Sequence, residues 1–291
     1  MFYLAQFWPT SEHLEGCIVN AWKAEGWACS TTQICLQDLY ESPDQTFECV
    51  YEPKAYVTLV VYVTHAVSTH GLYQVADNVA LGAREFLKLT TGPIHGLIAA
   101  SFFSAAIFLT CGRVYDSLEN TFELQEWIEG PDTFDSMVGM LNQRLAPCYL
   151  ASFLPKVATQ LLGYSHWDQR MVLDVWIRDT LACTHTDMIY FGKQEAPQVF
   201  FFSPMNTRPL GRELPSIHMV CKCRPDEKSR SNKKKWIVKH RGHEKMALNT
   251  IFIHIKCSQC GKGHGLTAKD HEGVLVKVGG LFAAVVPVFL S

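Results

Sequence analysis

Two side chains that could form a nucleophile and its base follow two apolar segments of the chain. Cys111 lies at the exit of the run 104–112, and His65 directly follows the run 56–64. A cysteine thiol reacts as its thiolate, and a neighbouring imidazole can lower its pKa and accept its proton. His70 follows shortly after His65 and is a rival for the base. The spacing therefore predicts a cysteine and histidine pair, with Cys111 as the nucleophile and His65 or His70 as the base.

Both apolar runs are predicted to be buried strands, because β-branched and apolar residues dominate them and no charge interrupts them. The other elements expected nearby are helices over 74–89, 115–128, 145–162 and 167–181, and strands over 134–140 and 187–191. Strands separated by helices of ten or more residues pair in parallel through right-handed crossovers. The pattern predicts an α/β fold with a mainly parallel sheet flanked by helices. Catalytic groups gather at the carboxyl ends of such strands, where His65 and Cys111 are expected.

The order of these elements resembles the caspase-like fold of cysteine peptidases (clan CD-like), and within it the CHAT-type branch. In that fold a His follows one core strand, and the nucleophilic Cys follows the next, with Gly nearby. The corresponding segments are Val63-Thr-His-Ala-Val-Ser-Thr-His-Gly71 and Phe108-Leu-Thr-Cys-Gly112. The resemblance covers residues 50–195, and the caspase signature Gln-Ala-Cys is absent at Cys111.

The resemblance implies either a cysteine endopeptidase or an inactive relative. In the implied mechanism the His takes the thiol proton, the thiolate attacks a peptide carbonyl, and an acyl-enzyme forms and is hydrolysed. Backbone N–H groups of Gly71 and Cys111, with Gly112 beside them, are the candidates for the oxyanion hole. The substrate or partner would be a protein or peptide.

Two cysteine pairs near the C-terminus have the spacing of a structural zinc site. Cys221 and Cys223 form the first pair, and Cys257 and Cys260 form the second. Four thiolates can close a tetrahedral zinc site in a small ribbon-like module. The one-residue spacing of the first pair strains a shared tetrahedron, so a histidine could replace one thiolate: His218, His240, His243 or His264. The alternative is a β-hairpin with reduced cysteines and no metal.

The composition indicates a globular protein inside the cell. The chain has 291 residues, of which 48% are hydrophobic and 19% charged, which is enough to bury a large core. Eleven cysteines form an odd count in a long chain, and the N-terminus lacks the features of a signal peptide. The uncharged run 94–112 could cross a bilayer as a helix, but Gly96 and Ser101 interrupt it, so we expect no membrane association.

Three parts are expected along the chain: an irregular segment over 1–50, the α/β domain over 51–202, and the zinc-ribbon-like module with an apolar tail over 203–291. Within the last part, residues 222–245 hold ten Lys and Arg against three Asp and Glu. Such a basic segment would suit an anionic partner such as nucleic acid, but a solvated loop is the commoner interpretation. The alternative to an enzyme is therefore a zinc-ribbon interaction protein whose α/β part is only a scaffold.

Overall fold

The computed structural model describes residues 1–43, 57–67, 71–111, 114–116, 118–142, 144–164 and 167–204, together with five strands between residues 236 and 287. The chain divides into two compact units, Met1–Pro197 and Gln198–Val288. His65 and Cys111, the candidate pair, belong to the first unit.

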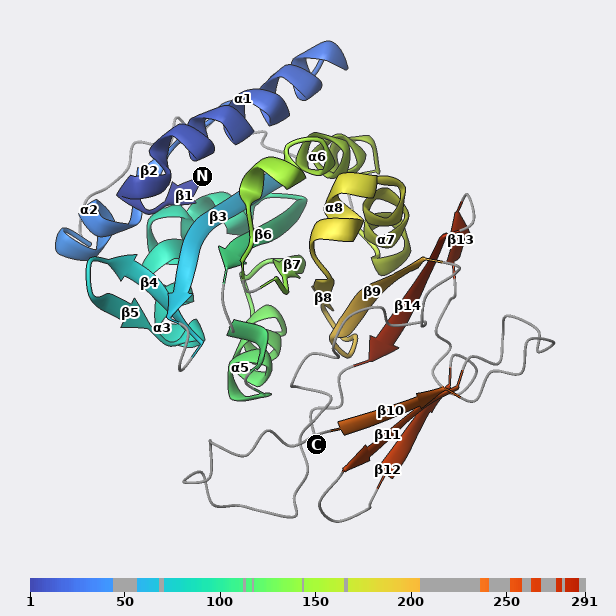
Figure 1. Ribbon diagram of the computed structural model, residues 1–291. Coiled ribbons are helices and arrows are strands. Elements are labelled where there is room, and N and C mark those ends of the chain that lie inside the picture. The colour runs from blue at the N-terminus through green and yellow to red at the C-terminus, as the bar shows by residue number, and fades with distance from the viewer. Residues whose placement is uncertain are drawn as a thin grey trace. The chain divides into compact units, whose positions relative to one another are not determined.

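The first unit is built on a mainly parallel sheet, with the strand order β8-β7-β6-β3-β1-β2 (Figure 1). Its strands are β1 (Phe2–Tyr3), β2 (Ile34–Cys35), β3 (Val57–Val67), β6 (Phe103–Cys111), β7 (Ser136–Met140) and β8 (Met188–Gly192). All of these neighbours pair in parallel except β7 and β8, which are antiparallel. Two short strands, β4 (Leu72–Ala76) and β5 (Val79–Leu81), extend the end of β3 as an antiparallel hairpin. The predicted α/β class with a mainly parallel sheet is confirmed.

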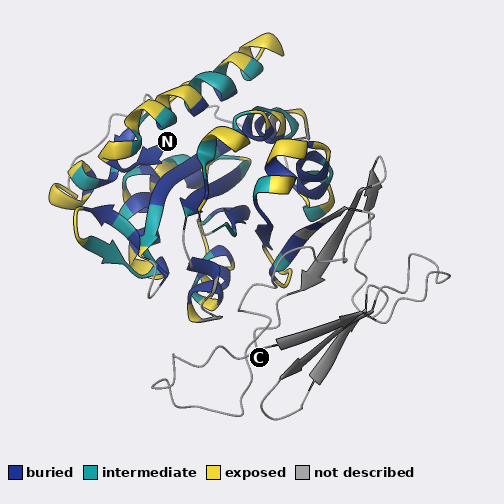
Figure 2. Cartoon of the chain, in the orientation of Figure 1, coloured by how far each residue is buried: buried dark blue, intermediate teal, exposed yellow. Residues whose placement is uncertain are grey.

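Helices cover both faces of this sheet, with α1 and α6 on one side and α3 and α5 on the other (Figure 1). The helices of the first unit are α1 (Trp8–Ala24), α2 (Leu36–Glu41), α3 (Ala83–Thr91), α4 (His95–Ala100), α5 (Leu118–Ile128), α6 (Phe153–Tyr164), α7 (Gln169–Arg178) and α8 (Thr180–His185). Short 3-10 turns are η1 (Ala5–Phe7), η2 (Gly92–Ile94), η3 (Val114–Asp116) and η4 (Pro147–Leu150). The central strands β6, β7 and β8 are almost entirely buried, whereas the helices carry exposed residues on their outer faces (Figure 2).

An aromatic row across three strands fixes the register at the centre of the sheet. Phe2 of β1 stacks on Tyr62 of β3 with ring centroids 5.2 Å apart, and Tyr62 stacks on Phe108 of β6 at 4.6 Å. Phe86 of α3 covers Tyr62 from one face. Because a slip of one residue would turn each ring to the opposite face, this row holds β3 and β6 in a single register.

Asp179 joins the two helices α7 and α8 near the edge of the unit. Its buried carboxylate accepts hydrogen bonds from the Ser152 hydroxyl at 2.6 Å, Lys156 Nζ at 2.8 Å and the Ala182 N–H at 3.1 Å. The Asp179 side chain is 3% exposed, so these bonds replace all of its contact with water. Burial alone would raise the pKa of Asp179, but the hydrogen bonds outweigh it and lower that pKa.

Two of the segments predicted in the first unit differ from the structure. The predicted helix over 74–89 begins with the β4–β5 hairpin, because Asp77 and Asn78 make a tight turn with Asn78 at a φ of 60°. Asparagine tolerates this left-handed conformation, so the chain reverses there and the helix begins only at Ala83. The segment 1–50, expected to be irregular, contains α1 and α2, and its strand β1 lies inside the sheet.

The connection after β7 also departs from the expected parallel pairing. Strand β8 returns antiparallel to β7 although three helices lie between them. A connection with several helices can bring the chain back to either end of the sheet, so the crossover rule for a single helix does not apply. Within the uncharged run 94–112, residues 95–100 form α4 and residues 103–111 form β6. Among the described residues no helix has the length and apolar character of a membrane span.

The second unit contains only antiparallel pairs among the residues that the structure describes. Strand β14 (Leu281–Pro287) pairs with β9 (Gln198–Pro204) and with β13 (Val276–Val278). A separate three-stranded sheet consists of β10 (Trp236–His240), β11 (Phe252–Cys257) and β12 (Gly263–Thr267). The division between the units falls after Pro197, a few residues before the expected boundary at 203.

Candidate functional site

His65 and Cys111 lie side by side on two adjacent parallel strands. They are direct partners in the register of β3 and β6, and His65 Nδ1 contacts Cys111 Sγ. Because side chains alternate between the two faces of a strand, partners in a parallel register point to the same face. The structure therefore brings together the two side chains that the sequence predicts as a pair.

The pair lies near the carboxyl ends of two central strands. Strand β6 ends at Cys111, whereas β3 continues past His65 to Val67 and into the β4 hairpin. The residue before His65, Thr64, is buried and donates its hydroxyl to the Gln74 carbonyl of β4 at 2.6 Å. This hydrogen bond joins β4 to β3 next to His65 and stabilises the position of the end of β3.

Burial sets the charge state of the pair. Both side chains are partly buried, and the Phe7 ring packs against the His65 ring at a centroid distance of 4.6 Å. Burial lowers the pKa of His65. Burial also raises the pKa of Cys111, although the backbone N–H groups of Cys111 and Ala66 act in the opposite direction. The lowered thiol pKa expected from the sequence is therefore not found, because loss of water outweighs these hydrogen bonds.

The hydrogen bond between the neutral thiol and the neutral imidazole depends on the tautomer of His65. With the ring proton on Nε2, Nδ1 is free to accept a hydrogen bond from the S–H group. In this arrangement His65 is placed to accept the thiol proton as the sulfur attacks, instead of holding a thiolate in advance.

The predicted oxyanion donors are partly outside the described part of the chain. The Gly71 N–H donates to the Val67 carbonyl at 3.1 Å, within a turn in which Gly71 has a φ of 68°. Binding of an oxyanion by this N–H would require that hydrogen bond to be exchanged. His70 and Gly112 lie outside the described residues.

Asn120 is a buried polar residue near the carboxyl ends of these strands that was not predicted from the sequence. Its side-chain amide donates to the Gly71 carbonyl at 2.8 Å and to the Val114 carbonyl at 3.1 Å. The sequence feature that could have identified Asn120 is its helical spacing from two buried residues of α5. It lies four residues before Leu124 and eight before Ile128. A polar residue on such a stripe needs buried hydrogen-bond partners.

Most of the predicted zinc ligands lie outside the described residues, namely Cys221, Cys223, Cys260, His218 and His243. Cys257 is the last residue of β11, where it is the register partner of Trp236. His240 and His264 belong to β10 and β12. No group of three or more His, Cys, Asp or Glu side chains suited to a metal ion occurs within the described part of the chain.

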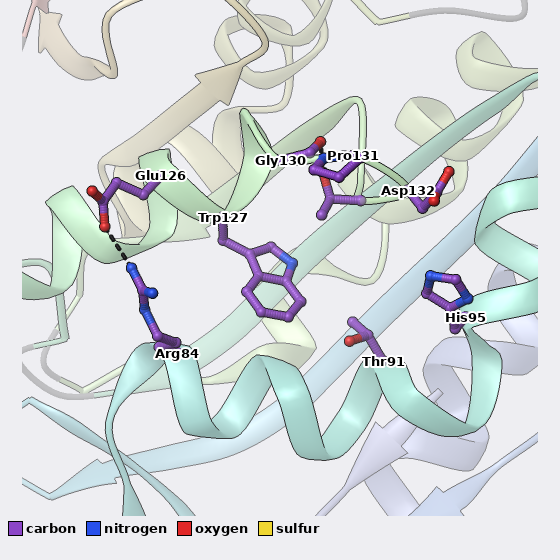
Figure 3. A pocket seen from close by; sticks show the side chains of 9 residues that line it. Arg84, Thr91, His95, Glu126, Trp127, Gly130, Pro131 and Asp132 are labelled. Atoms are coloured by element: carbon purple, nitrogen blue, oxygen red, sulfur yellow. Dashed lines mark hydrogen bonds and ion pairs between the residues drawn. The ribbon is translucent and has the colours of Figure 1, made fainter.

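A cavity of about 290 Å³ lies between α3, α5 and the loop after α5 (Figure 3). Arg84 and Glu126 form an ion pair of 2.5 Å at one side of it, and the Trp127 ring lies beside them (Figure 3). Neither His65 nor Cys111 is among the residues that line this cavity. The cavity is therefore not the substrate cleft of the predicted pair.

Comparison with known proteins gives no further guide to the chemistry of this site. No family model matches the chain, no curated protein matches it, and no solved structure matches it.

Proposed function

We propose that this chain has a caspase-like fold and is a cysteine peptidase or an inactive relative, with Cys111 as the nucleophile and His65 as the base. The observation that carries the proposal is the contact between His65 Nδ1 and Cys111 Sγ, near the carboxyl ends of two adjacent parallel strands. The order of a strand with His followed by a strand with Cys is the feature that resembles caspase-like peptidases. His65 is preferred over His70 because of this contact.

The proposed reaction assigns each proton to a named atom. His65 Nδ1 takes the thiol proton while Cys111 Sγ bonds to the carbonyl carbon of a peptide. The imidazolium then gives this proton to the leaving amine nitrogen, and a thioester remains on Cys111. A water molecule attacks the thioester, His65 takes a proton from that water, and the acid product leaves as the thiol is restored.

The same contact favours the peptidase over the scaffold hypothesis. A scaffold with a purely structural cysteine predicts Cys111 fully enclosed and without a neighbouring imidazole. Cys111 is instead only partly buried, and it touches His65. The basic segment and the zinc module remain proposals for the second unit, and they do not depend on the pair.

The proposal is tested by the pH dependence of Cys111 alkylation with iodoacetamide, followed by mass spectrometry. In a coupled pair, a small fraction of the molecules carries a thiolate beside an imidazolium. This fraction does not change with pH between the pKa of the histidine and the pKa of the cysteine. Burial lowers the pKa of His65 and raises that of Cys111, so a plateau should extend at least from about pH 6.5 to about pH 8.5. A second rise should follow at higher pH, where the free thiolate forms.

Controls for this measurement are present in the same chain. Cys148 is exposed and reports the reactivity of an ordinary thiol, whereas Cys183 is buried and reports unfolding. The variant His65→Ala should lose the plateau and keep the second rise. A Cys111 profile with a single rise in the unmodified protein, unchanged in His65→Ala, would overturn the pair.

Hydrolysis of a peptide library separates the two forms of the proposal. Cleavage that is lost in Cys111→Ser identifies an active peptidase. A plateau that depends on His65, without cleavage of any peptide or added protein, identifies an inactive relative. Cleavage that persists in Cys111→Ser would contradict the assignment of the nucleophile.

A further inference from the structure

We infer that Asn120 is a positioning residue, which holds the loop after His65 and the loop after Cys111 in the relative places that the pair requires. The inference rests on the proposed function for the role of the pair, and it concerns a residue that touches neither reacting atom. Asn120 lies in the first turn of α5 and is 6% exposed. A single side chain of this helix therefore reaches both loops.

The hydrogen bonds of Asn120 define the orientation of its amide. Nδ2 donates to the Gly71 carbonyl at 2.8 Å and to the Val114 carbonyl at 3.1 Å. Carbonyl oxygens only accept hydrogen bonds, so the group that faces both of them must be the NH2 group and not the amide oxygen. Both N–H donors are thus used on backbone atoms of two different loops.

These two loops continue directly from the strands that carry the pair. Gly71 lies six residues after His65 and closes the turn that its N–H makes with Val67. Val114 lies three residues after Cys111, at the start of η3. Since α5 is a regular helix, its Asn120 side chain ties the ends of β3 and β6 to one rigid element.

The chemistry of the pair depends on this placement. Proton transfer from Sγ to Nδ1 requires the two atoms to stay within hydrogen-bond reach, and a displacement of about 1 Å can cost on the order of 10²-fold in rate. Loss of the Asn120 amide would leave two buried carbonyls without these donors and would free the two loops to separate. The effect should appear in the coupling of His65 and Cys111 more than in the overall fold.

The experiment uses the alkylation profile of Cys111 in the full chain. Asn120→Ala removes the donors, and Asn120→Asp removes them while it keeps the shape of the side chain. The matched control is Gln125→Ala, because Gln125 is also 6% exposed on α5 and donates to the Gly192 carbonyl away from the pair. Cys183 is buried, so it is alkylated only when the protein unfolds. Its alkylation at several temperatures shows where each variant stays folded.

Both Asn120 variants should lower the His65-dependent plateau by about tenfold or more, and they should keep the rise at high pH. Gln125→Ala should leave the plateau unchanged. An unchanged plateau in either Asn120 variant, with Cys183 still protected, would overturn the inference. An equal loss in Gln125→Ala would overturn it too, because the effect would then be a general loss of stability.

The outcomes separate this inference from the proposed function. If the unmodified protein shows no plateau that depends on His65, the pair fails and the positioning role falls with it. If the plateau depends on His65 but not on Asn120, only the positioning role fails. The alkylation plateau can be measured even if the protein cleaves no peptide, because alkylation of Cys111 needs no substrate.

Discussion

Phe7 offers the sharpest test of how burial sets the chemistry of the candidate pair. Its ring lies 4.6 Å from the His65 ring, centroid to centroid, at an interplanar angle of 61°. Burial is the cause of the lowered His65 pKa, and Phe7 supplies part of that burial. The substitution Phe7→Ala should admit water to the imidazole and therefore raise the pKa of His65 toward its ordinary value of about 6.5.

The energy of the aromatic contact gives the scale of this shift. An aromatic pair contributes about 0.5–1.5 kcal/mol beyond the area that it buries. One pKa unit corresponds to about 1.4 kcal/mol. If this energy is lost from the neutral imidazole alone, the pKa of His65 rises by up to about one unit, in the same direction as the gain of water. The lower edge of the alkylation plateau should move to higher pH by the same amount.

The pKa is measured from the NMR titration of the His65 Cε1 proton in the unmodified protein and in the variant. Trp8→Ala is the control, because Trp8 is the next residue along the chain, is 44% exposed and packs on Tyr3. This control should leave the His65 titration unchanged. A lowered pKa in Phe7→Ala would refute the reasoning, because it would mean that the ring stabilises the imidazolium by a cation–π interaction.

Three further outcomes are expected. Asp179→Ala should lower the free energy of unfolding by about 2–4 kcal/mol, because three hydrogen bonds are lost. The Asp179 carboxyl has a lowered pKa in the fold, so this stabilisation is complete above about pH 3.9 and disappears as pH falls through the folded value; denaturation at several pH values will show whether the difference persists in acid. Gly139→Ala should cost about 1–3 kcal/mol by calorimetry, because a Cβ there would overlap the ring of Tyr115, whereas Gly16→Ala, with open space around it, should cost nothing; equal unfolding temperatures for the two variants would contradict this packing. If the second unit binds zinc, elemental analysis of the purified chain should find the metal, and Cys257→Ser should reduce its amount; a metal content that does not change would remove Cys257 from the ligand set.

The local pattern of the sequence was sufficient to predict the strands that carry the pair. Uninterrupted β-branched and apolar runs identify buried strands, and the helices between them indicate parallel pairing. Strand β8 was predicted at the right place but in the wrong direction, because the direction in which the chain returns to the sheet depends on packing. The β4–β5 hairpin was missed because it depends on a single turn at Asn78. The strands β1 and β2 have two residues each, which is too short for any periodic pattern.

By itself the sequence determined the α/β class and the two strands whose ends carry an imidazole and a thiol. Only the tertiary structure decided that His65 is the partner in contact with Cys111, since contact depends on the register of β3 and β6. It also decided that the thiol pKa is raised and that Asn120 joins the two loops. The physical reason is that burial and buried hydrogen bonds arise between residues far apart in the chain, where local spacing carries no information.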